Sequence, residues 1–456
     1  MREVINNQTT SNSTTTADIS GNTVYNATAL YTSDKPILVV SDKIDATSVI
    51  EAGGNAIAIG SLANIDSLIE LIDKNEPVQP LVLAINNDKA GKKAKTKIVQ
   101  YLGEKNHKYW TYNISGHYNS PTEAFRNDKE QFLKEVAIAV DYSKVIKIEY
   151  EKSSAYYDCI DFISTIKNNL FPVPIATGYD NLDKLLDGGL IPGLYIVGAI
   201  SSLGKTTFCL QIADYIAKHG NDVIYVSLEM DSRELIAKII SSKTYTIDSG
   251  NAVTTRELIS RYNHSPEKLN VINSATSDFG NYGKNIHIKV GVADISTDEI
   301  DKMIEKHIGI TGNHPVVIID YLQIIKAKNP RATDKQNTDA AVVDLKRISR
   351  DNNVPIITIS SFNRDNYTTA VNMASFKESG AIEYSSDVLI GLQYAGMDDY
   401  SGDKKGVAEI IAKANKMAKD GKPIAIQAKV LKNRNGCKGS ATLNFLPCYN
   451  YYSSGR

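Results

Sequence analysis

Cysteine is scarce in this 456-residue sequence. Its seven histidines form no H-E-x-x-H motif, and no C-x-x-C pair occurs among its four cysteines, which are Cys159, Cys209, Cys437 and Cys448. Neither a zinc site nor a disulfide-stapled scaffold is therefore expected. Sparse, unpaired cysteine is typical of proteins in a reducing compartment, so we expect a cytoplasmic protein.

An excess of charge and long apolar segments are also missing. The 51 basic and 52 acidic side chains leave a formal net charge of −1, so no overall basic field indicates a nucleic-acid partner. Local loops could still bind DNA. No basic stretch followed by an apolar core begins the chain, and no apolar run approaches the length that spans a bilayer. We therefore expect no membrane partner.

What the sequence does contain is the alternation typical of α/β domains. Residues 1–34 are rich in Asn, Ser and Thr and are predicted to form a disordered polar tail. Residues 35–127 alternate short apolar runs with helix-prone stretches, which predicts a small α/β domain. Residues 128–170 are charged and helix-prone and predict a helical linker. Residues 171–456 predict a larger α/β domain with a mostly parallel sheet.

The strongest chemical signal is the segment G-A-I-S-S-L-G-K-T-T, which follows an apolar strand candidate and opens an amphipathic helix. Backbone N–H groups at such a loop bind phosphate, Lys205 can reach the β- and γ-phosphates, and the Thr206 hydroxyl can bind Mg²⁺. A glycine-rich turn without function is the alternative, because Ala199 replaces the first Gly of G-x-x-x-x-G-K-[ST]. Further candidate nucleotide-binding residues are Gly198, Ser202, Gly204 and Thr207.

Two carboxylates follow apolar strand candidates of the same domain. Asp320 ends the run H-P-V-V-I-I-D, and Glu229 follows V-I-Y-V-S-L. An ATPase needs one acid to hold Mg²⁺ and one base to orient the attacking water, both beside the phosphate loop. Either residue alone could simply begin a turn. Together with the loop, the two residues predict a site for ATP and Mg²⁺.

These segments resemble the RecA-like motor domain of DnaB-type replicative helicases, over about residues 171–452. The resemblance implies a RecA-like P-loop fold, in which Glu229 is the catalytic base and Asp320 is the Walker B acid. It also implies that Lys205 and Thr206 bind phosphate and Mg²⁺. The matching stretches, in order, are TGYDNLDKLLDGGLIPG, GAISSLGKTT, VIYVSLEMDSREL, VVIIDYLQII, DLKRISRDNNVPIITISSFNR, ESGAIEYSSDVLIGL and KVLKNRNGCKGSATLNF.

The same resemblance implies functional residues outside the phosphate loop. Lys432 and Arg434 resemble the basic pair that this family inserts into the neighbouring subunit's ATP site, although solvated charges on an edge hairpin are the alternative. Ser361 stands where the family usually has a γ-phosphate-sensing Gln, and its side chain is too short for the same direct contact. The stretch MASFKESGAIEYSSD is similar to the family's DNA-facing loop. Candidate contacts to single-stranded DNA are Arg364, Lys377, Glu378 and Gly380.

The first domain resembles a Toprim domain over about residues 36–112, in the stretches VVSDKIDATSVIEAGGNAIAIGS and LVLAINNDKAGKKAKTKIVQYL. That family holds Mg²⁺ with a Glu and an Asp-x-Asp pair, since this hard cation prefers carboxylate oxygens. Here Ser41 occupies the Glu position and Asn86-Asn87-Asp88 the pair, so only Asp45 and Asp88 remain. We expect a Toprim-like scaffold without Toprim catalysis, used for docking or for guiding DNA.

Together the two resemblances imply an ATP-dependent DNA helicase that forms a ring, expected to be hexameric, and moves 5′ to 3′ on single-stranded DNA. Replication of a phage or mobile element is the implied setting, with a primase or loader protein as a candidate partner. An alternative is a DNA-dependent RecA-like ATPase that acts as a loader or recombination mediator without unwinding. The lost carboxylates disfavour a catalytic primase or nuclease.

Overall fold

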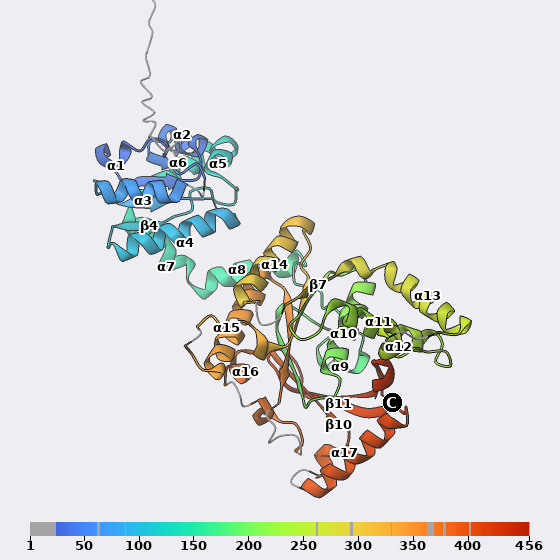
Figure 1. The fold of residues 1–456 in the computed structure, drawn as a ribbon. Coiled ribbons are helices and arrows are strands. Elements are labelled where there is room, and N and C mark those ends of the chain that lie inside the picture. The colour runs from blue at the N-terminus through green and yellow to red at the C-terminus, as the bar shows by residue number, and fades with distance from the viewer. Residues whose placement is uncertain are drawn as a thin grey trace, which may run out of the picture. The chain divides into compact units, whose positions relative to one another are not determined.

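The computed structural model divides the chain into two compact units, which meet in sequence between Leu170 and Phe171 (Figure 1). None of the helices in the described part of the chain is long and apolar enough to cross a membrane. Apart from the side chains of Lys89, Asp161 and Lys404, the structure describes residues 24–61, 64–86, 88–260, 263–291, 295–329, 331–362, 369–376, 380–400 and 403–455.

The first unit is built on a four-stranded parallel sheet with the order β2-β1-β3-β4. Its strands are short and almost wholly apolar, as expected for parallel strands that are covered on both faces. The elements are α1 (Ala29–Thr32), β1 (Ile37–Val40), α2 (Lys43–Glu51), β2 (Asn55–Ala58), α3 (Ile65–Lys74), β3 (Leu81–Leu83), α4 (Lys89–Glu104), β4 (Tyr109–Thr111), α5 (Pro121–Asn127), α6 (Lys129–Ala139), α7 (Tyr142–Lys152) and α8 (Ala155–Lys167).

The end of the expected polar tail is folded, which corrects the sequence prediction for residues 24–34. Val24 and Leu30 are buried in the core on one face of the first sheet. The backbone of Tyr25 exchanges two hydrogen bonds with Ala58, from N to O at 2.9 Å and in return at 3.2 Å. These few apolar side chains are enough to order the segment, although its average composition is polar. The remainder of the predicted tail, residues 1–23, lies outside the described residues.

The helix α6 is also part of the first unit, although the sequence suggested a linker from residue 128. Phe132, Val136 and Ala139 pack into the core on the other face of the first sheet, and Val145 of α7 joins them. Each of these four side chains is at most 2% exposed. The spacing of these residues follows the helical period, so one face of α6 covers the sheet and the other faces solvent.

The second unit contains a nine-stranded sheet with the order β13-β12-β11-β10-β5-β9-β8-β6-β7. Its remaining elements are α9 (Asp180–Leu185), β5 (Gly193–Ala199), α10 (Lys205–Lys218), β6 (Val223–Ser227), α11 (Ser232–Ile247), α12 (Thr255–Ile259), α13 (Pro266–Gly280), η2 (Gly283–Asn285), β7 (Ile286–Val290), α14 (Thr297–Thr311), β8 (Val316–Asp320), η3 (Leu322–Ile324), α15 (Asp334–Asn352), β9 (Pro355–Ser361), η5 (Met373–Phe376), α16 (Gly380–Ser385), β10 (Val388–Tyr394), η6 (Met397–Tyr400), α17 (Lys404–Lys419), β11 (Ile424–Asn433), β12 (Gly439–Leu446), η7 (Pro447–Tyr449) and β13 (Tyr451–Ser454).

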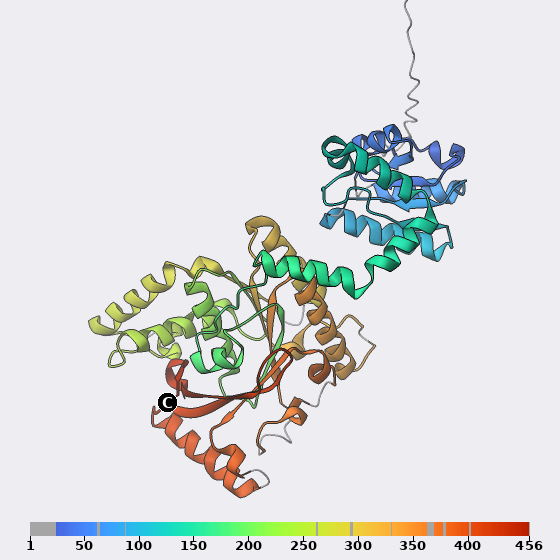
Figure 2. The same cartoon turned by 180° about the vertical axis from the view of Figure 1, so that it is seen from behind.

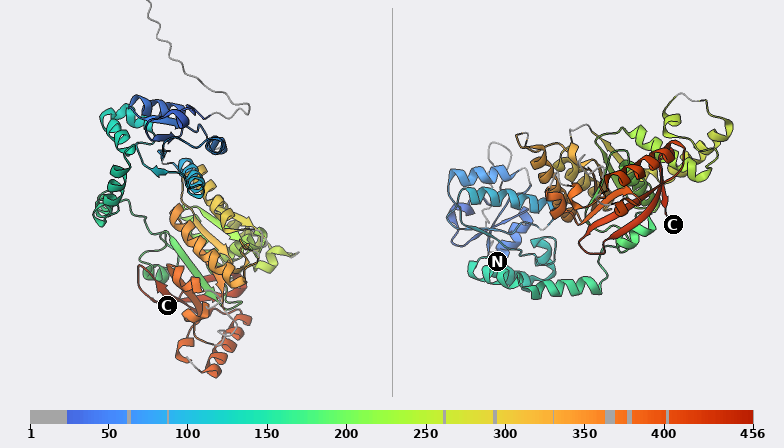
Figure 3. Two further views of the ribbon diagram at one scale, coloured as in Figure 1. Left: turned by 90° about the vertical axis from the view of Figure 1, so that its left-hand side faces the viewer. Right: turned by 90° about the horizontal axis from the view of Figure 1, so that it is seen from below.

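The strands from β10 to β7 run parallel, and β11, β12 and β13 extend this sheet as an antiparallel meander. Helices cover both faces of the sheet (Figure 3). Apolar residues of α10 and α11 fill the core on one face, while residues of α14, α15 and α16 fill the core on the other. The prediction of two α/β domains, the second with a mostly parallel sheet, is confirmed. Because the central strands are parallel, all of them end at one edge, where an α/β sheet usually binds its ligand.

Candidate ATP site at the carboxyl edge of the second sheet

Strand register brings the predicted nucleotide-binding segments together. Ser227, at the end of β6, pairs with Asp320, at the end of β8. Ala199, at the end of β5, pairs with Ser361, at the end of β9. Since β9 also pairs with β8, the four strand ends form one continuous edge. The residues that follow these strands therefore face a common site.

The phosphate loop connects β5 to α10 in two left-handed backbone steps. Ser202 has a φ of 64° and Gly204 a φ of 79°, which glycine adopts at no steric cost. A Cβ atom on Gly204 would also lie 2.6 Å from Phe445 Cζ, so the core behind the loop requires glycine there. This backbone path ends directly at the first turn of α10, whose free N–H groups favour an anion.

Lys205 is folded back onto its own loop. Its Nζ donates to the carbonyl oxygens of Ala199 at 3.0 Å and Ile200 at 3.2 Å. Burial lowers the pKa of Lys205, and the nearby carboxylates of Asp320 and Glu229 oppose that shift. Two loop carbonyls are weak partners for a buried ammonium group, so this cation fits a phosphate ligand.

Asp320 is 2% exposed and lies next to the start of α10. Burial raises the pKa of its carboxyl group, whereas hydrogen bonds from Thr206 and Tyr225 lower it; Glu229 adds a further rise by like-charge repulsion. The Tyr225 hydroxyl donates to Asp320 Oδ2 at 3.3 Å. The Thr206 hydroxyl, in the first turn of α10, and the Asp320 carboxylate, at the end of β8, are thus hydrogen-bonded to one another. Both are oxygen ligands suited to Mg²⁺.

Glu229 stands in a tight turn after β6. The Ser227 hydroxyl donates to the Met230 carbonyl oxygen at 2.6 Å and accepts from the Met230 amide at 3.2 Å, which closes the turn around Glu229. The Glu229 side chain is exposed, and its charge acts on both Lys205 and Asp320. A carboxylate that is close to the phosphate loop yet open to solvent is suited to act on a water molecule.

Two of the candidate nucleotide-binding residues have structural tasks. Gly198 lies inside β5, where a Cβ atom would be 2.2 Å from Phe376 and 2.4 Å from Phe362, so packing explains this glycine. Thr207 is buried, and its hydroxyl donates to Asn450 Oδ1 at 3.3 Å. Ser361, at the end of β9, pairs through its backbone with Ala199, the last residue before the phosphate loop.

The structure also shows residues that the sequence reasoning missed. Gln323 Nε2 donates to Ser360 Oγ at 3.0 Å, and Gln323 Oε1 is buried without a partner among the described residues. This amide lies next to Ser361, where the expected Gln is absent. Lys238 Nζ donates to Asn450 Oδ1 at 2.9 Å behind α10. Only the Y-L-Q string after Asp320 gave any signal in the sequence for Gln323.

Arg434 and Lys432 are not brought to the phosphate loop of their own chain. Asn433 pairs with Val388 at the start of β10, so this hairpin lies at the amino edge of the sheet. The seven-residue β5 separates that edge from the phosphate loop, which is about 20 Å at roughly 3.3 Å per residue. Arg434 Nη1 lies 3.6 Å from Asp387 Oδ1 and the side chain is 55% exposed.

Lys432 instead caps the helix α16. Its Nζ donates to the carbonyl oxygens of Glu383 at 2.7 Å, Tyr384 at 3.2 Å and Ser386 at 2.6 Å. Burial lowers the pKa of Lys432, and Arg434 adds to this shift. Lys432 therefore joins the hairpin to the helix that follows the candidate DNA loop.

The candidate DNA contacts are described only in part. Gly380 is the first residue of α16, and the next amide, that of Ala381, donates to Asp339 Oδ1 at 3.1 Å. The other three candidates, Arg364, Lys377 and Glu378, lie outside the described residues.

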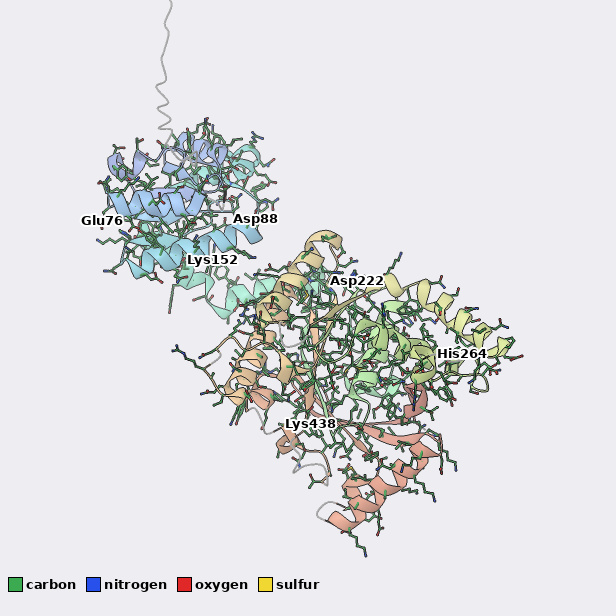
Figure 4. The ribbon with its side chains drawn as sticks, in the orientation of Figure 1. Glu76, Asp88, Lys152, Asp222, His264 and Lys438 are labelled. Atoms are coloured by element: carbon green, nitrogen blue, oxygen red, sulfur yellow. The ribbon has the colours of Figure 1, made fainter. Side chains whose placement is uncertain are left out.

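The corresponding edge of the first sheet has a different chemistry. Ser41 and Asn86 follow β1 and β3, and the Asn86 amide donates to Ser41 Oγ at 3.1 Å. Asp45 Oδ1 accepts from the hydroxyl of Thr122 at 2.7 Å and from its amide at 3.0 Å, which ties α2 to α5. Asp88 stands at the first turn of α4, where its Oδ1 accepts from the Gly91 amide at 2.6 Å (Figure 4). Both remaining carboxylates thus hold helix ends.

Comparison with known proteins agrees with this division. The family model described as DnaB-like helicase C terminal domain matches residues 174–454, and a Toprim-like model matches residues 39–124. The replicative DNA helicase DnaC of Bacillus subtilis is 26% identical over 302 residues, which is 65% of this chain and 59% of that protein. A probable plasmid replicative DNA helicase of Chlamydia psittaci is 27% identical over 285 residues, 60% of this chain and 54% of that protein. The matched region thus spans less than two thirds of these relatives.

Two solved structures share the fold. One is an isolated ATPase domain, which superposes with a TM-score of 0.54 at 21% identity, covering 67% of this chain and 99% of that one. The other solved structure is described as that of a DnaB-like replicative helicase and its interactions with primase. It superposes with a TM-score of 0.53 at 17% identity, covering 91% of this chain and 100% of that one. Both likenesses support the RecA-like architecture of the second unit.

Proposed function

This chain belongs to the DnaB-like helicase C terminal domain family, and on that premise we propose that it is an ATP-driven DNA helicase that acts in replication. The observation that carries the proposal is the meeting of Lys205, Thr206, Asp320 and Glu229 at one sheet edge. A loop suited to phosphate, a pair of oxygen ligands and an exposed carboxylate are the parts that phosphoryl transfer to water requires.

Each residue has a defined task in the proposed reaction. Lys205 leaves its two loop carbonyls and neutralises charge on the β- and γ-phosphates of ATP. The oxygens of Thr206 and Asp320 hold Mg²⁺, which supplies positive charge against the phosphates when bound. Glu229 orients the attacking water and accepts its proton. Burial raises the pKa of Asp320, because it disfavours the charged carboxylate. A bound cation offsets this cost, which fits the role of a Mg²⁺ ligand.

We propose that a second copy of the chain completes the site. Arg434 lies at the opposite edge from the phosphate loop of its own chain and is exposed, so in this proposal it acts on the loop of a neighbour. Asp387 holds this hairpin, because its carboxylate contacts Lys346 at 2.5 Å and its backbone oxygen accepts from the Arg434 amide at 2.9 Å. Repetition of this head-to-tail contact produces a ring when the rotation between neighbours closes, and six subunits is the family expectation.

The proposed substrate beside ATP is single-stranded DNA, contacted by the segment that includes Gly380. Movement from 5′ to 3′, and a primase or loader as partner, remain predictions from the family resemblance. A plasmid helicase among the relatives is consistent with replication of a phage or mobile element.

Strand displacement on a forked duplex tests the proposal. The protein should separate the strands when ATP and Mg²⁺ are present and the fork carries a 5′ single-stranded tail. Glu229→Gln is the control, because it keeps the phosphate loop and removes the base. A fork with only a 3′ tail should not be unwound if the polarity is as predicted.

A loader or recombination mediator is the competing function. It shares the same ATP site, so ATP hydrolysis alone cannot separate the two. If single-stranded DNA stimulates hydrolysis while no strand is displaced at any protein concentration, the helicase proposal is wrong and the loader is favoured.

A further inference from the structure

The helix α17 lies at the carboxyl edge of the second sheet. In the sequence it stands between the strands β10 and β11. The strand β10 reaches this edge at Tyr394, and β11 returns from it, since Ile426 pairs with Tyr394. The connection between them contains η6 and α17. The parallel pairing of β10 with β5 places this edge on the same side as the phosphate loop. Figure 2 shows α17 in orange-red, beyond the antiparallel strands at the end of the second unit.

One face of α17 anchors it to the sheet. Val407 and Ala414 are buried, and Ile410 and Ile411 pack against the same core. The helix contacts both β10 and β11. Its apolar face is therefore packed against the second sheet.

The opposite face of α17 is rich in lysine. On a helical wheel of 100° per residue, Lys405, Lys413, Lys416 and Lys419 fall within an arc of about 120° that is centred opposite Val407 and Ala414. All four side chains are exposed, and no ion pair holds any of them within the described residues. The same face contains one acid, Glu409. The lysines run along about 21 Å of helix, at 1.5 Å per residue.

This helix is connected to the described part of the candidate DNA loop. The Val371 amide, just before η5, donates to Gln393 Oε1 on β10 at 2.8 Å. Gln393 Nε2 donates in turn to Asp398 Oδ2 in η6 at 3.0 Å, and Lys429 lies 2.6 Å from the other oxygen of Asp398. Gln393 is 2% exposed, so this network is built into the fold. It ties η6, which contacts α17, to the segment just before η5.

The lysine face suits phosphates better than a protein or a membrane. Within the arc of the lysines lie Ala412 and Glu409, with Ala408 and Asn415 beside it. None of them is a large aromatic or apolar side chain that could anchor a protein partner. A basic amphipathic helix binds a membrane through its apolar face, which in α17 is buried against the sheet. A row of exposed ammonium groups on a helix that is fixed to the sheet can neutralise the phosphates of a nucleic-acid backbone.

We propose that the lysine face of α17 binds the backbone phosphates of single-stranded DNA and thus extends the path of the strand beyond the loop around η5. The inference rests on the proposed function, since it assumes that this edge faces DNA. Binding through α17 is independent of base sequence, because the contacts are ionic. Each phosphate contact contributes about 0.7 to the slope of the logarithm of the binding constant against the logarithm of the salt concentration.

Fluorescence anisotropy with a labelled oligothymidylate and a non-hydrolysable ATP analogue tests this proposal. The double variant Lys413→Ala/Lys416→Ala should bind about 25-fold more weakly at 0.1 M salt, with a salt slope shallower by about 1.4. Lys413→Arg/Lys416→Arg should restore binding. Lys302→Ala/Lys306→Ala, two exposed lysines with similar spacing on α14, is the matched control and should bind as the parent does.

The outcomes separate this inference from the proposed function. If the parent protein binds no oligothymidylate, the proposed function fails. If the parent binds and the α17 variant keeps both its affinity and its salt slope, the inference is wrong and the lysines serve another partner or none. ATP hydrolysis without DNA should be unchanged in the α17 variant, which shows that the second unit is still folded.

Discussion

In both sheets of this chain the parallel strands end at one edge, and the two edges are built alike but carry different chemistry. At the second edge, Asp320 is buried beside Thr206, and Glu229 is exposed next to Lys205. At the first edge, Ser41 and Asn86 hydrogen-bond to one another instead of offering charge. A parallel sheet thus brings strand ends together in both units, and only the residues at those ends decide whether a cation or phosphate can bind.

The carboxylates that remain at the first edge have structural hydrogen bonds in place of a metal-binding role. Asp45 and Asp88 accept hydrogen bonds from Thr122 and Gly91, so their charge stabilises helix ends. Burial raises the pKa of Asp45, and the bonds from Thr122 oppose this shift. Two dispersed carboxylates with local partners are a poor site for Mg²⁺, which prefers several oxygens in octahedral geometry.

The largest expected effect is at the second edge. Lys205→Ala should abolish ATP hydrolysis, because nothing else in the loop neutralises the phosphates. Glu229→Gln should also abolish turnover but should still bind ATP, because the phosphate loop and the proposed Mg²⁺ ligands are intact. Nucleotide affinity and single-strand-stimulated hydrolysis, measured for both variants, check this. Near-normal turnover in either variant would remove the residue from the site.

Arg434→Ala should lower ATP hydrolysis by about 10³-fold or more, as expected for an arginine finger. Mixing it with Lys205→Ala subunits should recover part of the activity, because some interfaces then combine an intact loop with an intact Arg434. The mixture is measured alongside each inactive variant. A mixture that forms joint rings yet stays inactive would contradict a role for Arg434 in the neighbour's site.

The first unit should be sensitive to the segment that precedes its first strand. Leu30 is fully buried, so Leu30→Ala should cost about 2–5 kcal/mol of the first unit's stability. Leu133→Ala on α6, where the leucine is 38% exposed, is the matched control and should cost far less. Thermal unfolding followed by the fluorescence of Trp110 reports on this unit. ATP hydrolysis by the second unit, measured at low temperature, should persist.

The smallest effect is expected at the first edge. Asp88→Ala should cost about 1 kcal/mol through loss of the cap on α4, with no change in any nucleotide chemistry. The parent protein should make no primers from nucleoside triphosphates on a single-stranded template. Primer synthesis that disappears in Asp88→Ala would mean that the first edge is still catalytic.

The grouping of residues at the candidate ATP site could be predicted from the sequence because its parts are local. Glycine, lysine and threonine follow an apolar strand at fixed spacing, and the acids end other apolar strands, so the parallel sheet alone is enough to gather them. The bonds from Thr207 to Asn450 and from Arg434 to Asp387 were not predictable in this way. They join residues far apart in the sequence and depend on strand order.

At both borders of the first unit, the prediction from average composition differed from the structure. Residues 24–34 are polar on average, yet Val24 and Leu30 pack into the core on one face of the first sheet and so order the segment. The linker prediction from residue 128 failed for α6 because no turn cluster separates it from the following helices. Its apolar stripe, which includes Phe132 and Val136, was the signal that the prediction did not use.

The comparison of the two edges is tested most directly by one pair of variants. Single-strand-stimulated ATP hydrolysis should be lost in Asp320→Asn, which removes the charge that we propose holds Mg²⁺. It should stay within about twofold of the parent in Asp45→Asn, whose remaining side-chain oxygen can still accept the bonds from Thr122. Normal hydrolysis in Asp320→Asn, or its loss in a folded Asp45→Asn protein, would contradict the assignment of the chemistry to the second edge.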